Sequence, residues 1–360
     1  MNPQRHVSWL RNIIRPAAVV AAISLLGVTL AACGNGDDNI QVADDADRIP
    51  VKIAHQSAGS LSFLAIRVAH DKGFFTDEGI DPEVITIGDP GVIGAALENR
   101  SVDVAADDNS VHAANFDRGI NLRVFAGLYQ GLRLQLVVRK GLDIPKMGDP
   151  GIEWKDVMAA MKGRVVATPG VAVSGGRIFE MLAGESGLKS GDYTLIETAA
   201  GAPLVGAIES GRADAFLHAD ATTITAVNSG VGEVALDLAD DIPEYFANLQ
   251  YVGFAALETT LKKYPQLQAR WQRATQRAVD LINDPANSEY LHDVALRSVN
   301  NMAATKDSPE LDATIRKLAP GYISEVDPAA FDTTLDFWRQ IGLLKSDVTG
   351  QELLWQAPSQ

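Results

Sequence analysis

The chain has 360 residues and is acidic, with a formal net charge of −15 at pH 7. A polyanion of this kind repels phosphates, so the composition excludes non-specific binding to nucleic acid. The sequence holds a single cysteine, Cys33, which excludes disulfides within the chain and a metal site built from several thiolates.

The first segment of the chain predicts export. Three arginines and no acidic residue precede an apolar run that begins near Ala17 and ends in Ala31-Ala32-Cys33. This order is typical of a signal peptide, here residues 1–32. Small residues before Cys33 resemble a bacterial lipobox, which implies lipidation of the Cys33 thiol and anchoring in the cell membrane. An uncleaved membrane helix is the alternative, although the run falls short of about 20 apolar residues. Residues 33–50 are polar and acidic, which predicts a flexible tether.

From residue 51 onward, short apolar runs alternate with helical segments, which predicts an α/β fold with largely parallel strands. The expected strands are residues 51–55, 83–87, 103–107, 122–127, 164–168, 193–197, 213–218 and 234–236. Helices are expected at 61–72, 92–99, 109–118, 175–185, 204–210 and 221–228. Two longer apolar strands, 132–139 and 249–256, bracket the second series. Four more helices, at 265–282, 288–302, 309–318 and 328–341, are expected to pack on the first half.

A short internal similarity links the two series. Residues 95–109 read AALENRSVDVAADDN, and residues 206–220 read GAIESGRADAFLHAD, which aligns Asp103 with Asp214. Each copy predicts a helix end, a turn and an apolar strand that leads into a polar loop. Two halves of similar plan are the simplest explanation, and chance similarity between unrelated α/β units is the alternative.

Residues 70–75 (HDKGFF) and 78–80 (EGI) resemble a signature of periplasmic-type substrate-binding proteins. The resemblance is to the branch that binds aliphatic sulfonates, nitrate, taurine and thiamine pyrimidine. Residues 97–104 and 162–166 resemble further pieces of the pattern, with Asn99-Arg100 in place of the usual glycine turn. The similarity covers residue 51 to about 344. The local chemistry is consistent, because Gly73 can end a helix in a left-handed conformation.

The resemblance implies a two-lobe, type II periplasmic-binding-protein fold with a cleft between the lobes and two hinge crossings. Residues 51–138 with 250–360 would form lobe one, and residues 139–249 would form lobe two. It further implies an extracytoplasmic receptor, monomeric and without a cofactor, that closes on a small organic solute. The closed form would deliver the solute to an ABC permease driven by an ATPase.

Candidate site residues follow from the rule that ligands bind beyond the carboxyl ends of strands, near helix N-termini. The residues that satisfy this rule, or that lie at the first crossing, are His55, Gln56, Ser57, Asp108, Asn109, Ser110, Tyr129, Gln130, Thr168, Ser174, Gly175, His218 and Asp220. Several of them are equally suited to helix capping alone.

The charge of the solute stays open. Helix N-termini favour an anion, and Arg133 and Arg177 are candidates for clamping one. Asp107, together with the aspartates already named, opposes an anion. An uncharged or cationic heterocycle stacked on Tyr129 or Phe63 is the competing hypothesis.

Two other functions are weighed. A metal-ion receptor would use His55, His112 and His218 with Asp108 or Asp220, but no close pairing of histidines supports it. An enzyme is the second, because the family fold includes a yeast pyrimidine synthase that uses a cysteine-rich motif. The present chain lacks that motif, a G-x-S-x-G elbow and a P-loop, so we predict no catalytic activity.

Overall fold

The computed structural model describes residues 48–56, 60–87, 90–298 and 309–357, which belong to one compact unit, Ile40–Gln360. The expected signal peptide, Cys33 and nearly all of the tether lie outside the described residues. Ser57, the side chain of Gln56 and the end of the helix expected at 288–302 also lie outside them.

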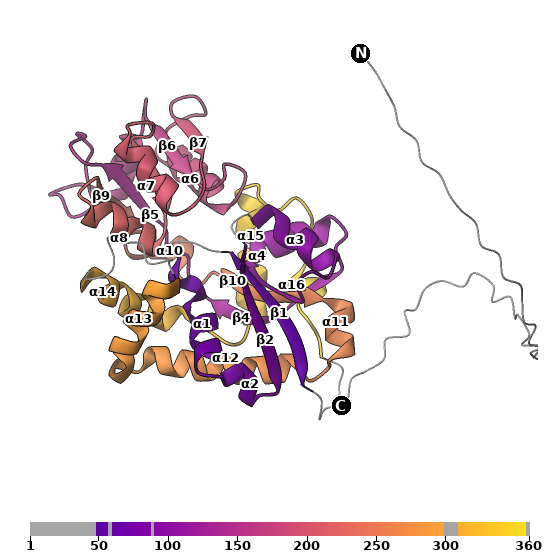
Figure 1. Cartoon of the computed structure of the whole chain (residues 1–360). Coiled ribbons are helices and arrows are strands. Elements are labelled where there is room, and N and C mark those ends of the chain that lie inside the picture. The colour runs from indigo at the N-terminus through magenta and orange to yellow at the C-terminus, as the bar shows by residue number, and fades with distance from the viewer. Residues whose placement is uncertain (1–47, 57–59, 88–89, 299–308, 358–360) are drawn as a thin grey trace, which may run out of the picture. The chain divides into compact units, whose positions relative to one another are not determined.

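Two five-stranded sheets form the framework (Figure 1). The first has the order β2-β1-β3-β10-β4, with bounds Ile80–Ile87, Ile49–Gln56, Val104–Asp108, Val252–Leu257 and Leu122–Tyr129. The second has the order β7-β6-β8-β5-β9, with bounds Thr194–Glu197, Val165–Thr168, Ala215–His218, Gln135–Arg139 and Gly232–Asp237. The expected two-lobe α/β fold is confirmed.

Four strands of each sheet run in the same direction, as expected, and the fifth strand runs against them, so each sheet is mixed. In the first sheet β10 runs antiparallel to both β3 and β4. In the second, β5 runs antiparallel to both β8 and β9. Both strands come from the long apolar runs expected at the crossings, and each inserts between two strands of its sheet. β5 pairs only within the second sheet, so we place the first crossing between Tyr129 and Gln135, earlier than the boundary near residue 138.

The two crossings lie side by side. Gly131 N donates to Leu249 O at 2.7 Å, and Tyr251 N donates to Tyr129 O at 3.1 Å. Backbone hydrogen bonds therefore join the two connections directly.

The internal similarity corresponds to an aspartate-to-backbone hydrogen bond that occurs in both halves. Asp103 lies just before β3, and its Oδ2 accepts a hydrogen bond from Lys52 N at 2.9 Å. Asp214 lies just before β8, and its Oδ2 accepts from Val165 N at 3.0 Å. In each half the aspartate ties the third strand of the series to the start of the first. Arg100 adopts φ +60° in the turn that glycine occupies in the second copy, so the departure from the usual glycine carries some backbone strain.

Helices cover both sheets. In chain order they are η1 (Leu61–Phe63), α1 (Leu64–Asp71), α2 (Phe74–Asp77), α3 (Pro90–Glu98), α4 (Asn109–Asp117), α5 (Trp154–Ala159), α6 (Ser174–Glu185), α7 (Ala202–Glu209), α8 (Asp220–Asn228), α9 (Leu238–Asp241), α10 (Pro243–Phe246), α11 (Glu258–Lys263), α12 (Leu267–Asn283), η2 (Pro285–Asn287), α13 (Ser288–Ser298), α14 (Pro309–Leu318), η4 (Ala319–Gly321), α15 (Pro328–Gln340) and α16 (Gly350–Leu353). Among these described helices, none has the length and the unbroken apolar character that crossing a bilayer requires.

The first lobe packs around an aromatic cluster. Trp271 of α12 is fully buried, and its ring lies 4.8 Å from that of Phe75 and 4.9 Å from that of Phe254, measured between centroids. Gly73 directs Phe75 into this cluster, because its left-handed φ of +72° ends α1 and begins α2, as expected. α12 thus packs on the first sheet, as the sequence indicated, whereas α14 also contacts α8 of the second lobe.

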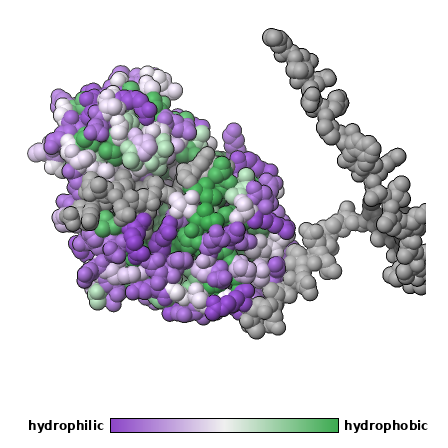
Figure 2. Space-filling model, viewed as in Figure 1, coloured by the Kyte–Doolittle hydropathy of each residue, from purple (hydrophilic) through white to green (hydrophobic). Residues whose placement is uncertain are grey.

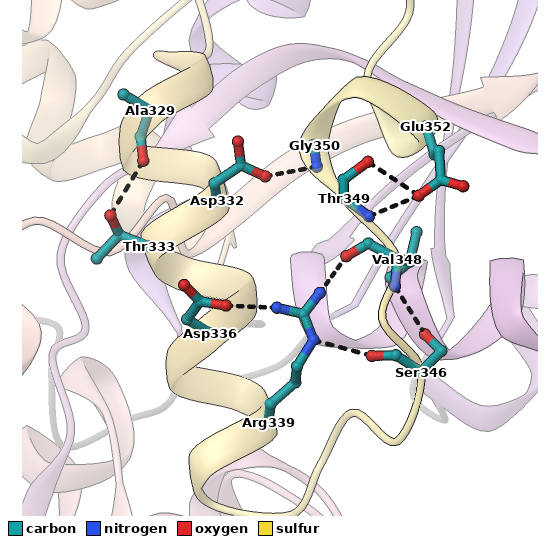
Figure 3. A network of polar contacts seen from close by, with 10 residues as sticks. All are labelled: Ala329, Asp332, Thr333, Asp336, Arg339, Ser346, Val348, Thr349, Gly350 and Glu352. Atoms are coloured by element: carbon teal, nitrogen blue, oxygen red, sulfur yellow. Dashed lines mark hydrogen bonds and ion pairs between the residues drawn. The ribbon is translucent and has the colours of Figure 1, made fainter.

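An arginine secures the C-terminal segment against α15 (Figure 3). Arg339 Nε donates to the carbonyl of Ser346 at 2.8 Å, and its Nη2 donates to the carbonyl of Val348. Asp332 accepts a hydrogen bond from Gly350 N at 2.6 Å, which holds α16 beside α15. These bonds leave α16 packed near β4 of the first sheet.

Hydrophilic residues cover most of the face seen in Figure 2, while hydrophobic residues gather around α3. Val92 of α3 is 46% exposed, the largest exposure among the large hydrophobic residues that the structure describes.

Candidate functional site

A cavity of about 80 Å³ lies where the carboxyl ends of strands from both sheets meet. Its lining residues are Ser60, Ser62, Phe63, Asp107, Asp108, Val111, Arg133, Leu134, Pro169, Val173, Ser174, Gly175, Leu217, His218, Ala219, Tyr251 and Val252. A wider opening of about 450 Å³ shares Val111 and Val173 with the cavity and continues past Ala114, Ala172, Leu343 and Lys345.

Two adjacent aspartates at the end of β3 form one wall. Asp108 caps α4, since its Oδ1 accepts a hydrogen bond from Ser110 N at 2.8 Å. Burial raises the pKa of Asp108 to about 6. Asp107 is fully buried, and its Oδ1 accepts from Asp108 N at 2.8 Å. Burial, and secondarily the neighbouring Asp108 charge, raises the pKa of Asp107 well above its usual value.

One oxygen of this pair has no protein partner. Asp107 Oδ2 is buried and lacks a hydrogen-bond partner among the described residues. Burying a carboxyl oxygen without a donor is costly, so such groups are uncommon away from functional sites.

A hydroxyl from the second lobe meets the acidic wall. Ser174, the first residue of α6, hydrogen-bonds through its side chain to both Asp108 and Tyr251. Asp108 and Tyr251 both belong to the first-lobe side of the cavity, so this hydroxyl links the two halves. Burial raises the pKa of Tyr251, which therefore remains a neutral phenol able to donate a hydrogen bond.

His218 and Asp220 come from the end of β8 and the start of α8. His218 lines the cavity, its Nδ1 lies 2.9 Å from Thr222 Oγ1, and burial lowers its pKa to about 4, so the ring is neutral. Asp220 has a left-handed φ of +44° and accepts a hydrogen bond from Leu61 N of the first lobe at 2.9 Å. Asp220 therefore joins the lobes beside the cavity rather than lining it.

Charged residues bridge the halves on the same side. Lys317 of α14 lies 2.6 Å from Asp237 and 2.5 Å from Asp240, both from the second lobe. Arg133 Nε donates to the hydroxyl of Tyr129 at 3.1 Å, and its Nη1 lies 3.8 Å from Asp240.

The structure brings part of the predicted set together. Asp108, Ser174, Gly175 and His218 line the cavity, while Ser110 lines the wider opening. The remaining described members do not line the cavity, namely His55, Asn109, Tyr129, Gln130, Thr168 and Asp220.

Each of these residues has a structural reason for its position. His55 Nε2 lies 3.0 Å from Arg67 Nη2 of α1 and 3.2 Å from Thr86 Oγ1 of β2, so its side chain contacts these two elements. Asn109 donates to the carbonyl of Gln250 at 2.6 Å. Thr168 closes its own loop, since its hydroxyl donates to Gly170 O at 2.9 Å.

The crossing residues also differ from expectation. Tyr129 is fully buried and packs edge-on against Tyr322, with 5.1 Å between ring centroids. Gln130 N donates to Gly321 O at 2.8 Å, so its backbone belongs to the crossing. Arg177, a candidate anion clamp, pairs instead with Glu180 at 2.7 Å.

Tyr251 is a polar aromatic residue of the cavity that the sequence did not single out. Tyr129 of the first crossing was the expected polar aromatic residue. Tyr251 of the second crossing lines the cavity instead. The available signal was the position of Tyr251 one residue before an apolar strand. Among the described residues, no group of three or more His, Cys, Asp or Glu is placed to hold a metal ion.

Two mixed sheets of matching strand order, with a cavity at their facing strand ends, define the periplasmic-binding-protein class. Residues 60–288 match the model of the NMT1/THI5 like family, and the chain belongs to that family. No curated protein matches the sequence.

Solved structures with the same fold include three proteins named for the small anions that they bind. The alkanesulfonate-binding protein SsuA from Xanthomonas axonopodis pv. citri, bound to MOPS, has a TM-score of 0.68 and 13% identity over 86% of this chain and 99% of that one. The periplasmic aliphatic sulphonate binding protein SsuA from Escherichia coli has a TM-score of 0.66 and 15% identity over 86% and 98%. The periplasmic nitrate-binding protein NrtA from Synechocystis PCC 6803 has a TM-score of 0.63 and 15% identity over 84% of each chain.

Proposed function

We propose that this protein is an extracytoplasmic receptor that captures a small organic solute by closing its lobes and delivers it to an ABC importer. The observation that carries the proposal is a cavity walled by strand ends of both sheets, with an unpartnered buried carboxyl oxygen in Asp107. Similar structures named as sulfonate- and nitrate-binding proteins support the same role. Asp108, Ser174, Gly175, His218 and Tyr251 are the proposed contacts.

Closure of the lobes is supported by the contacts that join them. The Ser174 hydroxyl bonds Asp108 across the cavity, and Lys317 pairs with aspartates of the second lobe. The paired crossings near Gly131 and Leu249 supply a narrow, hydrogen-bonded hinge. A solute that bridges both walls would add to these contacts and favour the closed state.

Solute capture is tested by filling the cavity. The full-length protein, solubilised in detergent, is analysed by native mass spectrometry for co-purified solute. We expect Val111→Trp to lose the solute, since Val111 lines the cavity. The same substitution at Val227, which is 38% exposed on α8, is the matched control and should retain it. Equal retention by both variants, or chemical conversion of the solute, would refute the receptor proposal.

The position outside the cell is a separate part of the proposal. We propose that Cys33 carries the acyl chains that keep the receptor beside its permease. Metabolic labelling with radioactive palmitate should mark the wild-type protein and leave Cys33→Ser unlabelled. The variant should also move from the membrane fraction to the soluble extracytoplasmic fraction, and its retention in membranes would contradict the anchor.

A further inference from the structure

Asp107 lies opposite a residue that cannot supply a side-chain hydrogen bond. It pairs in register with Gly253 of β10, which has no side chain. A Cβ at Gly253 would lie 2.6 Å from Asn109 Oδ1, so the close packing leaves no room for a donor there. Asp107 Oδ1 is already engaged by Asp108 N, and Oδ2 has no partner among the described residues. Because Asp107 lines the cavity, a bound solute is the group that we expect to supply the donor that Oδ2 lacks.

The charges around the cavity disfavour an anion. Among the described lining residues, Arg133 is the one Lys or Arg side chain, against two aspartates. Arg133 Nε donates to the Tyr129 hydroxyl, and its Nη1, which has no hydrogen-bond partner among the described residues, lies 3.8 Å from the Asp240 carboxylate. Lys317, just outside, contacts two further aspartates. Burial raises the pKa of both aspartates, and a cation beside them favours their ionised form whereas an oxyanion opposes it. The surplus of carboxyl groups therefore favours a cationic solute over an oxyanion.

Helix N-termini often bind anions, but carboxylates of the protein itself already occupy two of those near the cavity. Asp108 caps the N-terminus of α4 by accepting a hydrogen bond from Ser110 N. Asp220 accepts from Leu61 N, the first residue of η1. The start of α6 has no side-chain cap, but its Ser174 hydroxyl is directed to Asp108 and Tyr251. The fold therefore supplies its own carboxylates at two of the positions where an oxyanion would bind.

We propose that the solute presents a compact cationic nitrogen group with N–H donors, such as an amidinium or guanidinium, to Asp107. This inference rests on the proposed receptor function and specifies its solute. A volume of about 80 Å³ suits a compact head group, since about 10–15 Å³ on the same measure holds one water molecule. The rest of the solute extends into the opening beyond Val111 and Val173. The nitrogen head group distinguishes this site from the sulfonate and nitrate named for similar structures.

Pairs of ions with the same shape and opposite charge test the proposal. Acetamidinium is compared with acetate, and guanidinium with nitrate, by calorimetry on full-length wild-type protein dialysed free of solute. We expect the two cations to bind saturably at millimolar concentration and at least about tenfold more tightly than the anion of each pair, as loss of a charged hydrogen bond implies. Equal or tighter binding of acetate or nitrate would overturn the nitrogen-cation assignment.

A variant then locates the binding. Asp107→Asn keeps the shape of the side chain and should weaken acetamidinium binding about tenfold to hundredfold. Asp81→Asn, on the exposed face of β2, makes the same charge change and should leave binding unchanged. Unchanged binding by Asp107→Asn overturns the inference, as does failure of all four probes. A different result would refute the receptor function, namely retention of the co-purified solute by Val111→Trp.

Discussion

Replacing Asp220 with asparagine is expected to stabilise the protein at neutral pH. Burial raises the pKa of Asp220 from 3.8 to about 6, net of the favourable charges of Arg133 and Lys317. The folded protein therefore holds this proton more tightly than the unfolded chain does. At about 1.4 kcal/mol per pH unit, ionising the buried carboxyl costs about 3 kcal/mol of folding stability above both pKa values.

The sign of the pH dependence follows from that difference. The contribution of Asp220 to stability is present below about pH 4 and is lost as the pH rises through about 6. The asparagine amide oxygen can still accept from Leu61 N, and asparagine tolerates the left-handed φ of +44°. Asp220→Asn should thus gain up to about 3 kcal/mol over wild type near pH 7.5 and nothing near pH 4.

Urea unfolding followed by circular dichroism at the two pH values measures this gain. Asp81→Asn, exposed on β2, is the control for the change in net charge and should show no such difference. A variant less stable than wild type near pH 7.5, or one whose effect is the same at both pH values, would refute the reasoning. The ionised carboxyl would then be stabilising in the folded protein.

Three further predictions test the lobes and the surrounding packing. Lys317→Met removes half-exposed ion pairs between the lobes, worth about 1 kcal/mol, and should enlarge the solute-free protein in small-angle X-ray scattering. Gly176→Ala places a Cβ 2.5 Å from a backbone oxygen of the preceding loop, which should cost about 1–3 kcal/mol by thermal melting. Gly184→Ala on the same helix meets nothing within 4 Å and should gain about 0.5–1 kcal/mol instead. Arg339→Met leaves two C-terminal carbonyls without donors, at about 1–3 kcal/mol, and should speed hydrogen exchange over residues 344–350.

Local rules predicted the fold well where backbone geometry depends on one residue. Gly73 adopts the left-handed conformation that the end of its helix requires. The alignment of Asp103 with Asp214 predicted two similar halves, and both aspartates make the same strand-tying bond.

The direction of β5 and β10 could not be predicted in the same way. An apolar run such as 132–139 is suited to either direction, because alternation along a strand carries no information about its partner. The decisive contacts join residues far apart in the chain, as in the pairing of Val252 with Asp108.

The candidate site was predicted at the level of loops rather than side chains. Asp108, Ser174, Gly175 and His218 follow from the ends of strands, and all four line the cavity. A residue's position does not fix the direction of its side chain, so His55 turned out to face Arg67 instead. For the same reason, Tyr129 packs against Tyr322 outside the cavity, while Tyr251 of the second crossing lines it.

β5 follows the strands of the first sheet but pairs in the second, and β10 follows the strands of the second sheet but pairs in the first. This arrangement constrains how the chain can be divided. A fragment that stops before residue 252 lacks the strand that separates β3 from β4, so two neighbouring strands of the first sheet keep unpaired edges. Open edges of this kind recruit other chains and lead to aggregation. No single cut between the series yields two self-sufficient pieces, and on the ribosome the first sheet stays unfinished until more than two thirds of the polypeptide has been made.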